Sequence, residues 1–296
     1  MPGGLLNIVS YGAANIILNG NPTKTFFTAV YKKYTNFGLQ RFRIDFDGQR
    51  NLSFDANTIM KFKVPRYAEL LWDTYIVMNL PDVWSPLYAR PDLKDLSGTP
   101  YEFRWIENLG FNMIQEISII SGGATLAQYS GEWMQNAVSR DDGTKIDLIN
   151  RMTGNVPELN NPGNAFGRNN TYPTAIYDGS CVNIEPSIRG RQLYIPLMAW
   201  FCYASKLALP LVAMQYQEVF INIEFKSIRE LFTIRAVNLP QTEITGTCPP
   251  ILAMPNTGLA PYRAPNAASV IDQLWRFIQP PPKPEANADP AYIASY

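Results

Sequence analysis

The composition of this chain is that of a folded protein without a charge bias. Of its 296 residues, 46% are hydrophobic and 17% are charged, which suits one large domain or two of ordinary size. Lys and Arg number 25, as do Asp and Glu, so the formal net charge is zero. A general nucleic-acid binder needs a basic excess, so this class is disfavoured. The absence of histidine excludes Ser-His-Asp and Cys-His catalysis and every histidine-containing metal site.

The first 23 residues lack the pattern of a secretory signal. Met1–Thr23 carries no charged side chain, and Asn7, Ser10, Asn15 and Asn19 interrupt its apolar residues. A signal peptide needs a positive start followed by an unbroken apolar stretch. We therefore expect no targeting signal here, but an N-terminal arm that packs beneath the folded domain or against a neighbour.

Strict alternation of apolar and polar residues is the dominant pattern of the chain. It occurs in Arg41–Asp47, Met60–Val64 and Glu218–Lys226. Successive residues of a strand point to opposite faces, so these runs bury one face and leave the other polar. This is typical of antiparallel sheets packed face to face.

Two further stretches are more apolar and predict inner strands, Trp72–Leu80 and Ile114–Ile120. After the second, Gly122-Gly123 predicts a tight turn that leads into Ala124–Ala127.

The apolar run Leu193–Met214 is long enough to span a membrane. It contains Lys206 near its middle and prolines at Pro196 and Pro210. A charge at the centre of a spanning helix is costly, and prolines suit strand edges. We therefore expect two buried strands joined near Ser205.

Helical patterns are few. Apolar residues recur at helical spacing in Trp133–Val138, after a capping residue, Ser130. A second short helix is predicted where a capping box at Ser269–Asp272 precedes an apolar stripe that reaches Ile278. Pro280 ends that helix.

The pattern divides the chain into three parts. We expect an N-terminal arm over residues 1–38, a folded domain over 39–235 and a proline-rich connector with a short helix over 236–296. Eleven of the 24 prolines follow Leu239, where strand alternation stops. Within the domain, Pro81–Pro100 and Asn155–Asp178 are long irregular stretches, which predicts functional surface.

No set of residues makes a convincing catalytic or metal site. Asp45-Phe46-Asp47 has the DxD spacing of some metal-dependent transferases, but its flanking alternation favours the outer face of a strand. Asp141-Asp142-Gly143 lacks the further oxygen ligands of a calcium loop and predicts a polar turn. Phosphate-binding glycine loops are missing. We predict no catalytic residue, no cofactor and no metal, and hence no enzyme.

Other short motifs also favour structural roles. The basic triplet Arg189-Gly190-Arg191 fits a solvated loop or an interface anchor. Glycosylation sequons at Asn51 and Asn169 are interpreted as chance matches in a chain without a signal peptide. Three cysteines are too few for a disulfide framework, and Cys202, in an apolar run, is expected to be a buried inert thiol.

Three groups of short motifs follow one another along the chain. The first consists of Gly3–Leu5, Tyr11–Ala13, Gly20–Pro22, Thr25–Phe27 and Val30–Phe37. The second consists of Ser121–Gly123 and Tyr129–Trp133. The third consists of Ile195–Leu197, Trp200–Phe201, Leu207–Leu211 and Gln215–Val219. This ordered set resembles the major capsid protein of the nucleocytoplasmic large DNA viruses, which often has histidine at the positions of Tyr34 and Gln217.

The resemblance implies a double jelly roll, of which residues 39–235 would form the first half. That half is an all-β, antiparallel eight-stranded jelly-roll sandwich with long loops, and residues 236–296 would lead toward the second roll. It also implies a structural subunit whose trimeric capsomers tile an icosahedral shell. Implied partners are neighbouring capsomers and minor capsid proteins, near an internal membrane and without direct nucleic-acid contact. The implied location is the virion capsid, assembled in the host cytoplasm.

Two other functions stay open at this point. A jelly-roll carbohydrate-binding module, used for attachment, would present clustered aromatic side chains from the sixteen Tyr, fifteen Phe and six Trp. A hydrolase working with carboxylates alone would need two acids about 5–9.5 Å apart in a cleft. The sequence offers no convincing pair of this kind.

Overall fold

The computed structural model describes residues 36–46, 51–85, 101–141, 143–175, 185–236, 260–269 and 272–280. The chain divides into two compact units, Met1–Arg43 and Ile44–Tyr296. In the first unit the described residues, 36–43, form neither helix nor strand. All helices and strands of the described residues lie in the second unit.

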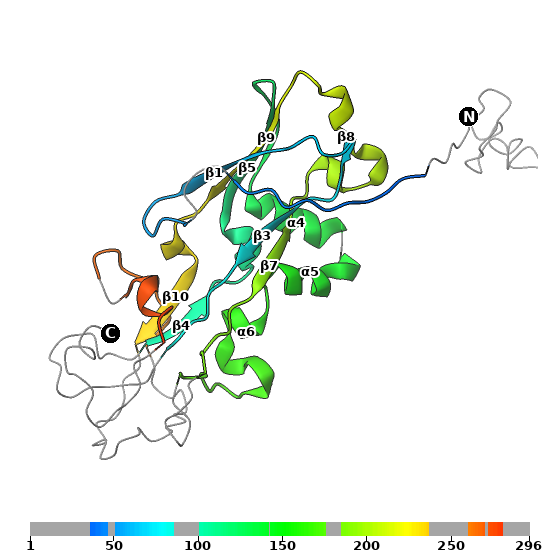
Figure 1. Ribbon diagram of the computed structural model, residues 1–296. Helices are drawn as coiled ribbons and strands as arrows, with labels where there is room; N and C mark the ends of the chain where they lie inside the picture. Colours follow the sequence, from blue (N-terminus) through cyan, green and yellow to red (C-terminus); the bar gives the residue numbers. More distant parts are fainter. Residues whose placement is uncertain are drawn as a thin grey trace, which may run out of the picture. The chain divides into compact units, whose positions relative to one another are not determined.

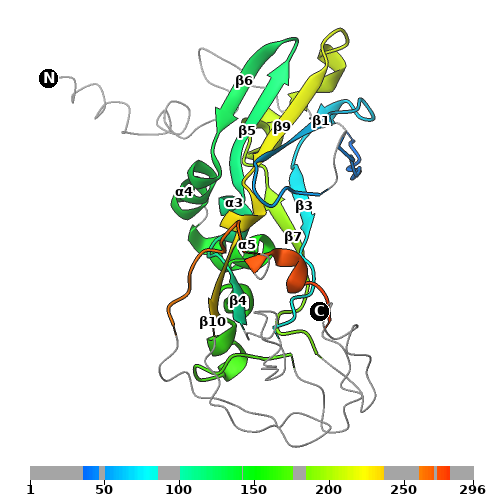
Figure 2. The same cartoon turned by 90° about the vertical axis from the view of Figure 1, so that its left-hand side faces the viewer.

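The largest sheet has four strands, and its order is β1-β9-β5-β6 (Figures 1 and 2). The strands are Thr58–Lys63 (β1), Val219–Phe225 (β9), Ile114–Ser121 (β5) and Ala124–Tyr129 (β6). Figure 2 shows the four strands side by side. All three pairings are antiparallel, as the alternation predicts.

Three further sheets have two strands each. They are Tyr101–Trp105 (β4) with Phe232–Ala236 (β10), Tyr75–Asn79 (β3) with Gln192–Pro196 (β7), and Leu70–Leu71 (β2) with Leu209–Pro210 (β8). These pairs are antiparallel too. Antiparallel sheets are therefore confirmed for the described residues, which form several small sheets.

Short helices also occur between the strands, more of them than the sequence predicts. The α-helices are Leu109–Asn112 (α3), Gly131–Asp141 (α4), Ile146–Thr153 (α5) and Pro157–Asn160 (α6). The 3-10 helices are Gly143–Lys145 (η2), Pro162–Gly167 (η3), Trp200–Cys202 (η4), Ser205–Leu207 (η5), Leu211–Ala213 (η6), Ile228–Glu230 (η7) and Leu274–Arg276 (η9). Helix α4 packs against α3 and β5, and α5 packs against β7 (Figure 1).

The register of the four-stranded sheet follows from its alternating apolar residues. Ile223 of β9 lies opposite Met60 of β1 on one side and opposite Ile117 of β5 on the other, and all three are buried. The intervening residues, such as Glu224, point to the opposite face. Ile76 of β3 belongs to the same hydrophobic core, so the β3–β7 pair and the larger sheet bury one common set of side chains.

The strands β4 and β5 are consecutive parts of one long ribbon. Helix α3 separates them. Their pairing partners, β10 and β9, are likewise separated by η7. The N–H of Ile106 donates to the carbonyl of Leu231 at 3.1 Å, and this bond keeps the two sides together where the ribbon is interrupted. The β4–β10 pair therefore continues the sheet beyond a break that affects both strands (Figure 2).

The turn between β5 and β6 has the predicted geometry. Gly122 and Gly123 have φ angles of 57° and 85°, which a two-residue hairpin of this kind requires at both central positions. A side chain at either position would be strained, so glycine is favoured twice in succession.

The first predicted helix is confirmed as α4. Ser130 caps it, because its hydroxyl accepts a hydrogen bond of 3.2 Å from the N–H of Trp133. Gly131 allows a close approach, since a Cβ at this position would lie 2.0 Å from the carbonyl oxygen of Phe111. The helix thus begins at a residue pair that fixes both its cap and its distance from α3.

The second predicted helix is wrong in its cap and its length. Among the described residues 272–280, Leu274–Arg276 forms a 3-10 helix and Asp272 also has 3-10 conformation, but a bend at Gln273 separates them. The carboxylate of Asp272 does not serve a capping box; it pairs with Arg263 and accepts a hydrogen bond from the N–H of Asn266. The guanidinium of Arg263 binds the buried carboxylate more strongly than a backbone N–H of the helix would. The capping-box pattern of residues 269–272 does not include Arg263 and so could not predict this contact.

Two predicted strands also differ from the structure. Residues 41–46 take neither helix nor strand conformation, and Asp47 lies outside the described residues. A strand needs a continuous backbone ladder, which alternating side chains alone do not provide. In Trp72–Leu80 a strand forms over Tyr75–Asn79, and among the described residues it pairs with β7 alone, so an inner strand is not seen there. By contrast, Ile114–Ile120 does lie inside, between β9 and β6.

The run Leu193–Met214 contains the strands β7 and β8 with 3-10 turns between them, close to the prediction of two strands joined near Ser205. No helix among the described residues has the length and apolar character needed to cross a membrane. The irregular stretch 155–178 forms α6 and η3 as far as it is described; residues 86–100 and 176–178 lie outside the described residues.

Candidate functional site

The two acidic motifs of the sequence, at residues 45–47 and 141–143, form no acidic cluster among the described residues. Asp45 is exposed. Asp141 pairs with the neighbouring Arg140, whose hydrogen bond lowers the pKa of the carboxyl group. Asp142, like Asp47, lies outside the described residues. Within the described ranges no three Cys, Asp or Glu side chains are grouped so that they could hold a metal ion.

The basic triplet anchors a loop by intramolecular bonds. Arg191 reaches Glu158 at 3.1 Å, and the N–H of Gly190 donates to Asp82 at 2.7 Å. Arg189 pairs with Glu185 at 3.5 Å on the surface. The Gly190 bond ties the segment before β7 to the segment after β3, and the Arg191 pair ties it to α6.

The other single-residue candidates have structural surroundings. Cys202 is partly buried, and burial raises the pKa of its thiol, which disfavours the thiolate form. Cys181 and Cys248 lie outside the described residues. Both sequon asparagines, Asn51 and Asn169, are exposed.

Two of the motif groups meet in space around Tyr129. Its hydroxyl donates to the carbonyl of Leu197 at 2.7 Å, and its ring lies 5.1 Å from that of Trp133. Burial raises the pKa of Tyr129, so it stays a donor over the ordinary pH range. The segments Tyr129–Trp133 and Ile195–Leu197 therefore form one junction, which joins β6 and α4 to the end of β7.

The outward face of the β3–β7 pair is apolar except at one end, where Asn79 and Gln192 lie opposite each other. Tyr75, Val77, Tyr194 and Pro196 alternate with buried neighbours and lie opposite one another in register. Val77 is 50% exposed at its centre. A sheet face turned to water usually carries polar residues, so an aromatic and aliphatic face is typical of a contact surface. We call these four residues the β3–β7 face.

Exposed apolar side chains also gather at one end of the four-stranded sheet. The segments 66–72 and 209–217 are joined there by the β2–β8 pair, and the Arg66 guanidinium binds the carbonyls of Gln215 and Gln217. The exposed large side chains of this end are Tyr67, Leu70, Trp72, Val212 and Tyr216. Aromatic residues of this kind are enriched in protein interfaces.

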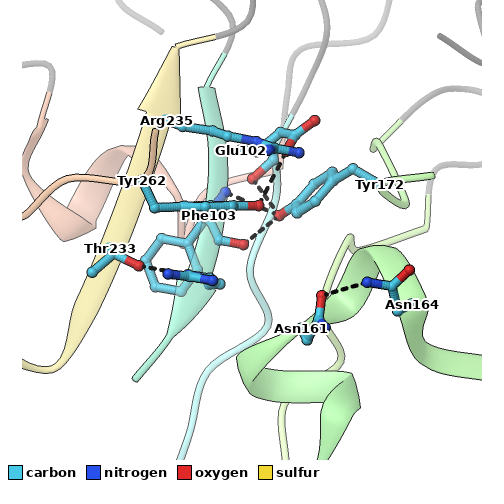
Figure 3. A network of polar contacts seen from close by, with 10 residues as sticks. Glu102, Phe103, Asn161, Asn164, Tyr172, Thr233, Arg235 and Tyr262 are labelled. Carbon is cyan, nitrogen blue, oxygen red and sulfur yellow. Dashed lines mark hydrogen bonds and ion pairs between the residues drawn. The ribbon is translucent and has the colours of Figure 1, made fainter. Parts of the chain in front are cut away.

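The opposite end contains a buried polar network on the β4–β10 pair (Figure 3). Glu102 of β4 is 4% exposed and pairs with Arg235 directly across on β10. The hydroxyl of Tyr262 donates to the same carboxylate at 3.1 Å. Next along the pair, the Arg104 Nε donates to the Thr233 hydroxyl at 2.9 Å. The network fills the polar face of the pair, so each buried charge has a partner.

A side chain closes the free edge of β4. The hydroxyl of Tyr172 accepts from the N–H of Phe103 at 3.1 Å and donates to its carbonyl at 2.8 Å (Figure 3). The Ser85 hydroxyl lies 3.1 Å from it. In a nearby turn, the side-chain amide of Asn164 donates a hydrogen bond of 3.1 Å to the side-chain oxygen of Asn161 (Figure 3).

A hollow of about 450 Å³ lies at the break of the ribbon. Two cations, Arg104 and Lys226, and two carboxylates, Glu107 and Glu230, line it with the amides of Asn112 and Asn160. The two positive and two negative side chains balance one another in charge.

A match to a known protein family decides the family. Residues 25–262 match the family described as major capsid protein N-terminus. The chain belongs to this family. The match confirms the resemblance predicted from the ordered motifs, whose second and third groups meet at the Tyr129 junction.

Individual relatives of this capsid-family chain are viral proteins. The major capsid protein of Phaeocystis pouchetii virus is 30% identical over 260 residues, which are 83% of this chain and 45% of that protein. Capsid protein 1 of Acanthamoeba polyphaga mimivirus is 31% identical over 235 residues, 78% of this chain and 36% of that protein. The chain thus spans less than half the length of these curated relatives.

Among solved structures, a quasi-atomic description of the PBCV-1 virus capsid is similar. It is 21% identical, with a TM-score of 0.43, and the similarity covers 69% of this chain and 38% of the other.

The sequence did not predict the buried polar network of the β4–β10 end. Glu102, Arg235 and Tyr262 lie far apart in the sequence, and Glu102 and Arg235 are separated by 133 residues. The one local signal was the mixed polar alternation of β4 around Phe103, with Glu102 and Arg104 on either side.

Proposed function

We propose that this chain is a structural subunit of a viral capsid, the N-terminal part of a major capsid protein. The observation that supports this most is the family match over residues 25–262. The relatives that match most of this chain are named capsid proteins of large DNA viruses. In this proposal the chain has no enzymatic activity, cofactor or metal, and it does not bind nucleic acid directly.

The finer architecture is part of the same proposal. Residues 39–235 correspond to an eight-stranded jelly roll, the first of two, with residues 1–38 as an arm and 236–296 as the connector. The four-stranded sheet β1-β9-β5-β6 supports one of its layers, and the β3–β7 pair, which shares the core, supports part of the other.

The proposed assembly is a homotrimeric capsomer of an icosahedral shell. Its neighbours are other capsomers and minor capsid proteins, and it is assembled in the host cytoplasm close to an internal membrane. The exposed β3–β7 face supports a contact between copies, since Val77 at its centre is half exposed and the two tyrosines of the face, Tyr75 and Tyr194, lie next to it and opposite it. Contacts of this kind lose most affinity when their centre is charged.

Light scattering after size exclusion tests the proposal. The wild-type chain is expected to have the mass of a trimer, and Val77→Glu the mass of a monomer with unchanged circular dichroism. Thr125→Glu, on the exposed strand β6, is the matched control and stays trimeric. A wild-type monomer at every concentration would contradict the proposal, and one that also binds glycans would support the carbohydrate-binding alternative.

A further inference from the structure

The described residues 260–269 and 272–280, coloured orange in Figure 1, lie against the β4–β10 pair. We call them the clasp. They contact the pair at its polar face, at its edge and at its buried face. Each contact involves a different residue of the clasp.

On the polar face the contact is made by Tyr262. The guanidinium groups of Arg104 and Arg235 lie over its ring, 3.9 and 4.5 Å from the ring centroid. Its hydroxyl donates to Glu102, which joins the ring to the ion pair between the strands. Stacking on two arginines places the ring above both β4 and β10.

At the edge of β10 the contact is a short backbone pairing. The N–H of Arg263 donates to the carbonyl of Ile234 at 2.8 Å, and the N–H of Ile234 donates back at 3.0 Å. The guanidinium of Arg263 binds the carboxylate of Asp272, which is 0% exposed. Asp272 also accepts from the N–H of Asn266 at 2.8 Å, so the loop is tied to itself where it crosses the edge.

On the buried face the contact is made by Phe277. Its ring lies 5.3 Å from that of Phe103 and 6.5 Å from that of Phe232, which stack on each other. Its carbonyl accepts from the N–H of Trp84 at 2.7 Å. The clasp therefore continues the hydrophobic core on the side opposite to Tyr262.

We propose that the clasp is a strap that locks the β4–β10 pair and covers the edge of β10. A two-stranded sheet is marginally stable alone, and the break at α3 and η7 separates this pair from the larger sheet. The pair and the clasp then open and close together as one local unit. With the clasp open, the edge of β10 and the Phe103–Phe232 stack lose the cover that Arg263 and Phe277 provide. This proposal does not depend on the proposed function.

Hydrogen exchange with limited trypsin digestion of this chain tests the strap. Phe277→Ala removes the buried contact, and Asp272→Asn removes the charge at nearly constant volume. Both are expected to speed exchange at Ile234 and tryptic cleavage after Arg276 by about tenfold or more. Exchange in β5 and β9 is expected to stay unchanged. Trp275→Ala, an exposed neighbour in the same segment, is the control and changes neither readout.

Three results would overturn the proposal. One is cleavage of wild-type Arg276–Phe277 as fast as the exposed Arg168–Asn169 bond. Another is unchanged exchange at Ile234 in both variants. The third is opening of β9 together with β10 in Asp272→Asn, because the unit would then not be local.

Discussion

The hydroxyl of Tyr172 takes both backbone hydrogen bonds of Phe103 on the free side of β4, donating one and accepting the other. A single side chain thus replaces the neighbouring strand at this position. The hydroxyl and both backbone groups are buried, so no water can substitute for a lost bond. Buried backbone groups without partners are costly, and this makes the tyrosine a point of large local stabilisation.

Tyr172→Phe is therefore expected to lower the free energy of unfolding by about 1–3 kcal/mol, since it leaves the N–H and carbonyl of Phe103 unpaired. Urea denaturation measures the loss. Tyr194→Phe is the control: its hydroxyl binds Gln192 on the exposed β3–β7 face, so a change within about 0.5 kcal/mol is expected. Equal losses in both variants would contradict the role of Tyr172.

Alkaline pH is expected to destabilise the protein through its buried tyrosines. Burial raises the pKa of Tyr129, Tyr172 and Tyr262, and the nearby Glu102 carboxylate raises that of Tyr262 further. Unfolded tyrosines ionise near pH 10, so above about pH 10 the folded protein binds more protons than the unfolded chain. The free energy of unfolding therefore falls as pH rises beyond that point.

Urea titrations on either side of pH 10 measure this fall. Tyr172→Phe removes one of the three groups and should make the fall shallower by one proton. A wild-type stability that does not change across this range, or an unchanged slope in the variant, would show that these tyrosines ionise normally in the folded state.

The register of the central sheet predicts opposite fates for two isoleucines on adjacent strands. Ile223 of β9 is 2% exposed, whereas Ile59 of β1 is 69% exposed. Ile223→Ala is expected to cost about 2–5 kcal/mol, because it leaves a cavity in the core. Ile59→Ala should stay within about 0.5 kcal/mol. Thermal or urea unfolding of the two variants compares them directly, and similar losses would mean that β1 is shifted by one residue.

Two glycines with open surroundings separate backbone strain from packing. A Cβ at Gly123 or at Gly143 would meet no atom within 4 Å, but only Gly123 has a positive φ, of 85°. Gly123→Ala is expected to lose about 1 kcal/mol, and Gly143→Ala to gain up to about 1 kcal/mol by restricting the unfolded chain. Equilibrium unfolding gives both values. A neutral Gly123→Ala would indicate a different turn.

The strands predicted well are those whose neighbours enforce the same alternation. Glu218–Lys226 became β9, which lies between two strands that share its buried face, so the side-chain period and the ladder agree. Residues 41–46 alternate just as regularly but take no strand conformation. Alternation predicts which side chains a strand would bury if it formed. Whether the strand forms depends on a second segment that lies beside it and completes its backbone hydrogen bonds.

Helix α5 was missed although its sequence carried a signal. Ile146 and Ile149 pack on the core and Thr153 is buried, a spacing that fits one helical face. Gly154, with a φ of 83°, ends the helix in the left-handed conformation that glycine favours. Polar residues surround these positions, so the apolar stripe is narrow and gives only a weak helical pattern.

The contact surfaces could be predicted only in part. The ordered motifs gave the family, because they lie at junctions such as Tyr129 with Leu197. The buried pair of Glu102 with Arg235 could not be foreseen, since its members become neighbours only through the register of β4 and β10. The apolar β3–β7 face was hidden for a similar reason, as its outward side was read as the inside of a sheet.

The long ribbon is interrupted at α3 on one strand and at η7 on the other, and at η7 the chain can gain residues without disturbing the strands. Within β9, one inserted residue would turn every following side chain to the wrong face. At η7 the ladder stops and then restarts at Phe232, and Glu230 there is exposed. Extra residues at η7 would be absorbed as a larger bulge, and the registers before and after it would both survive.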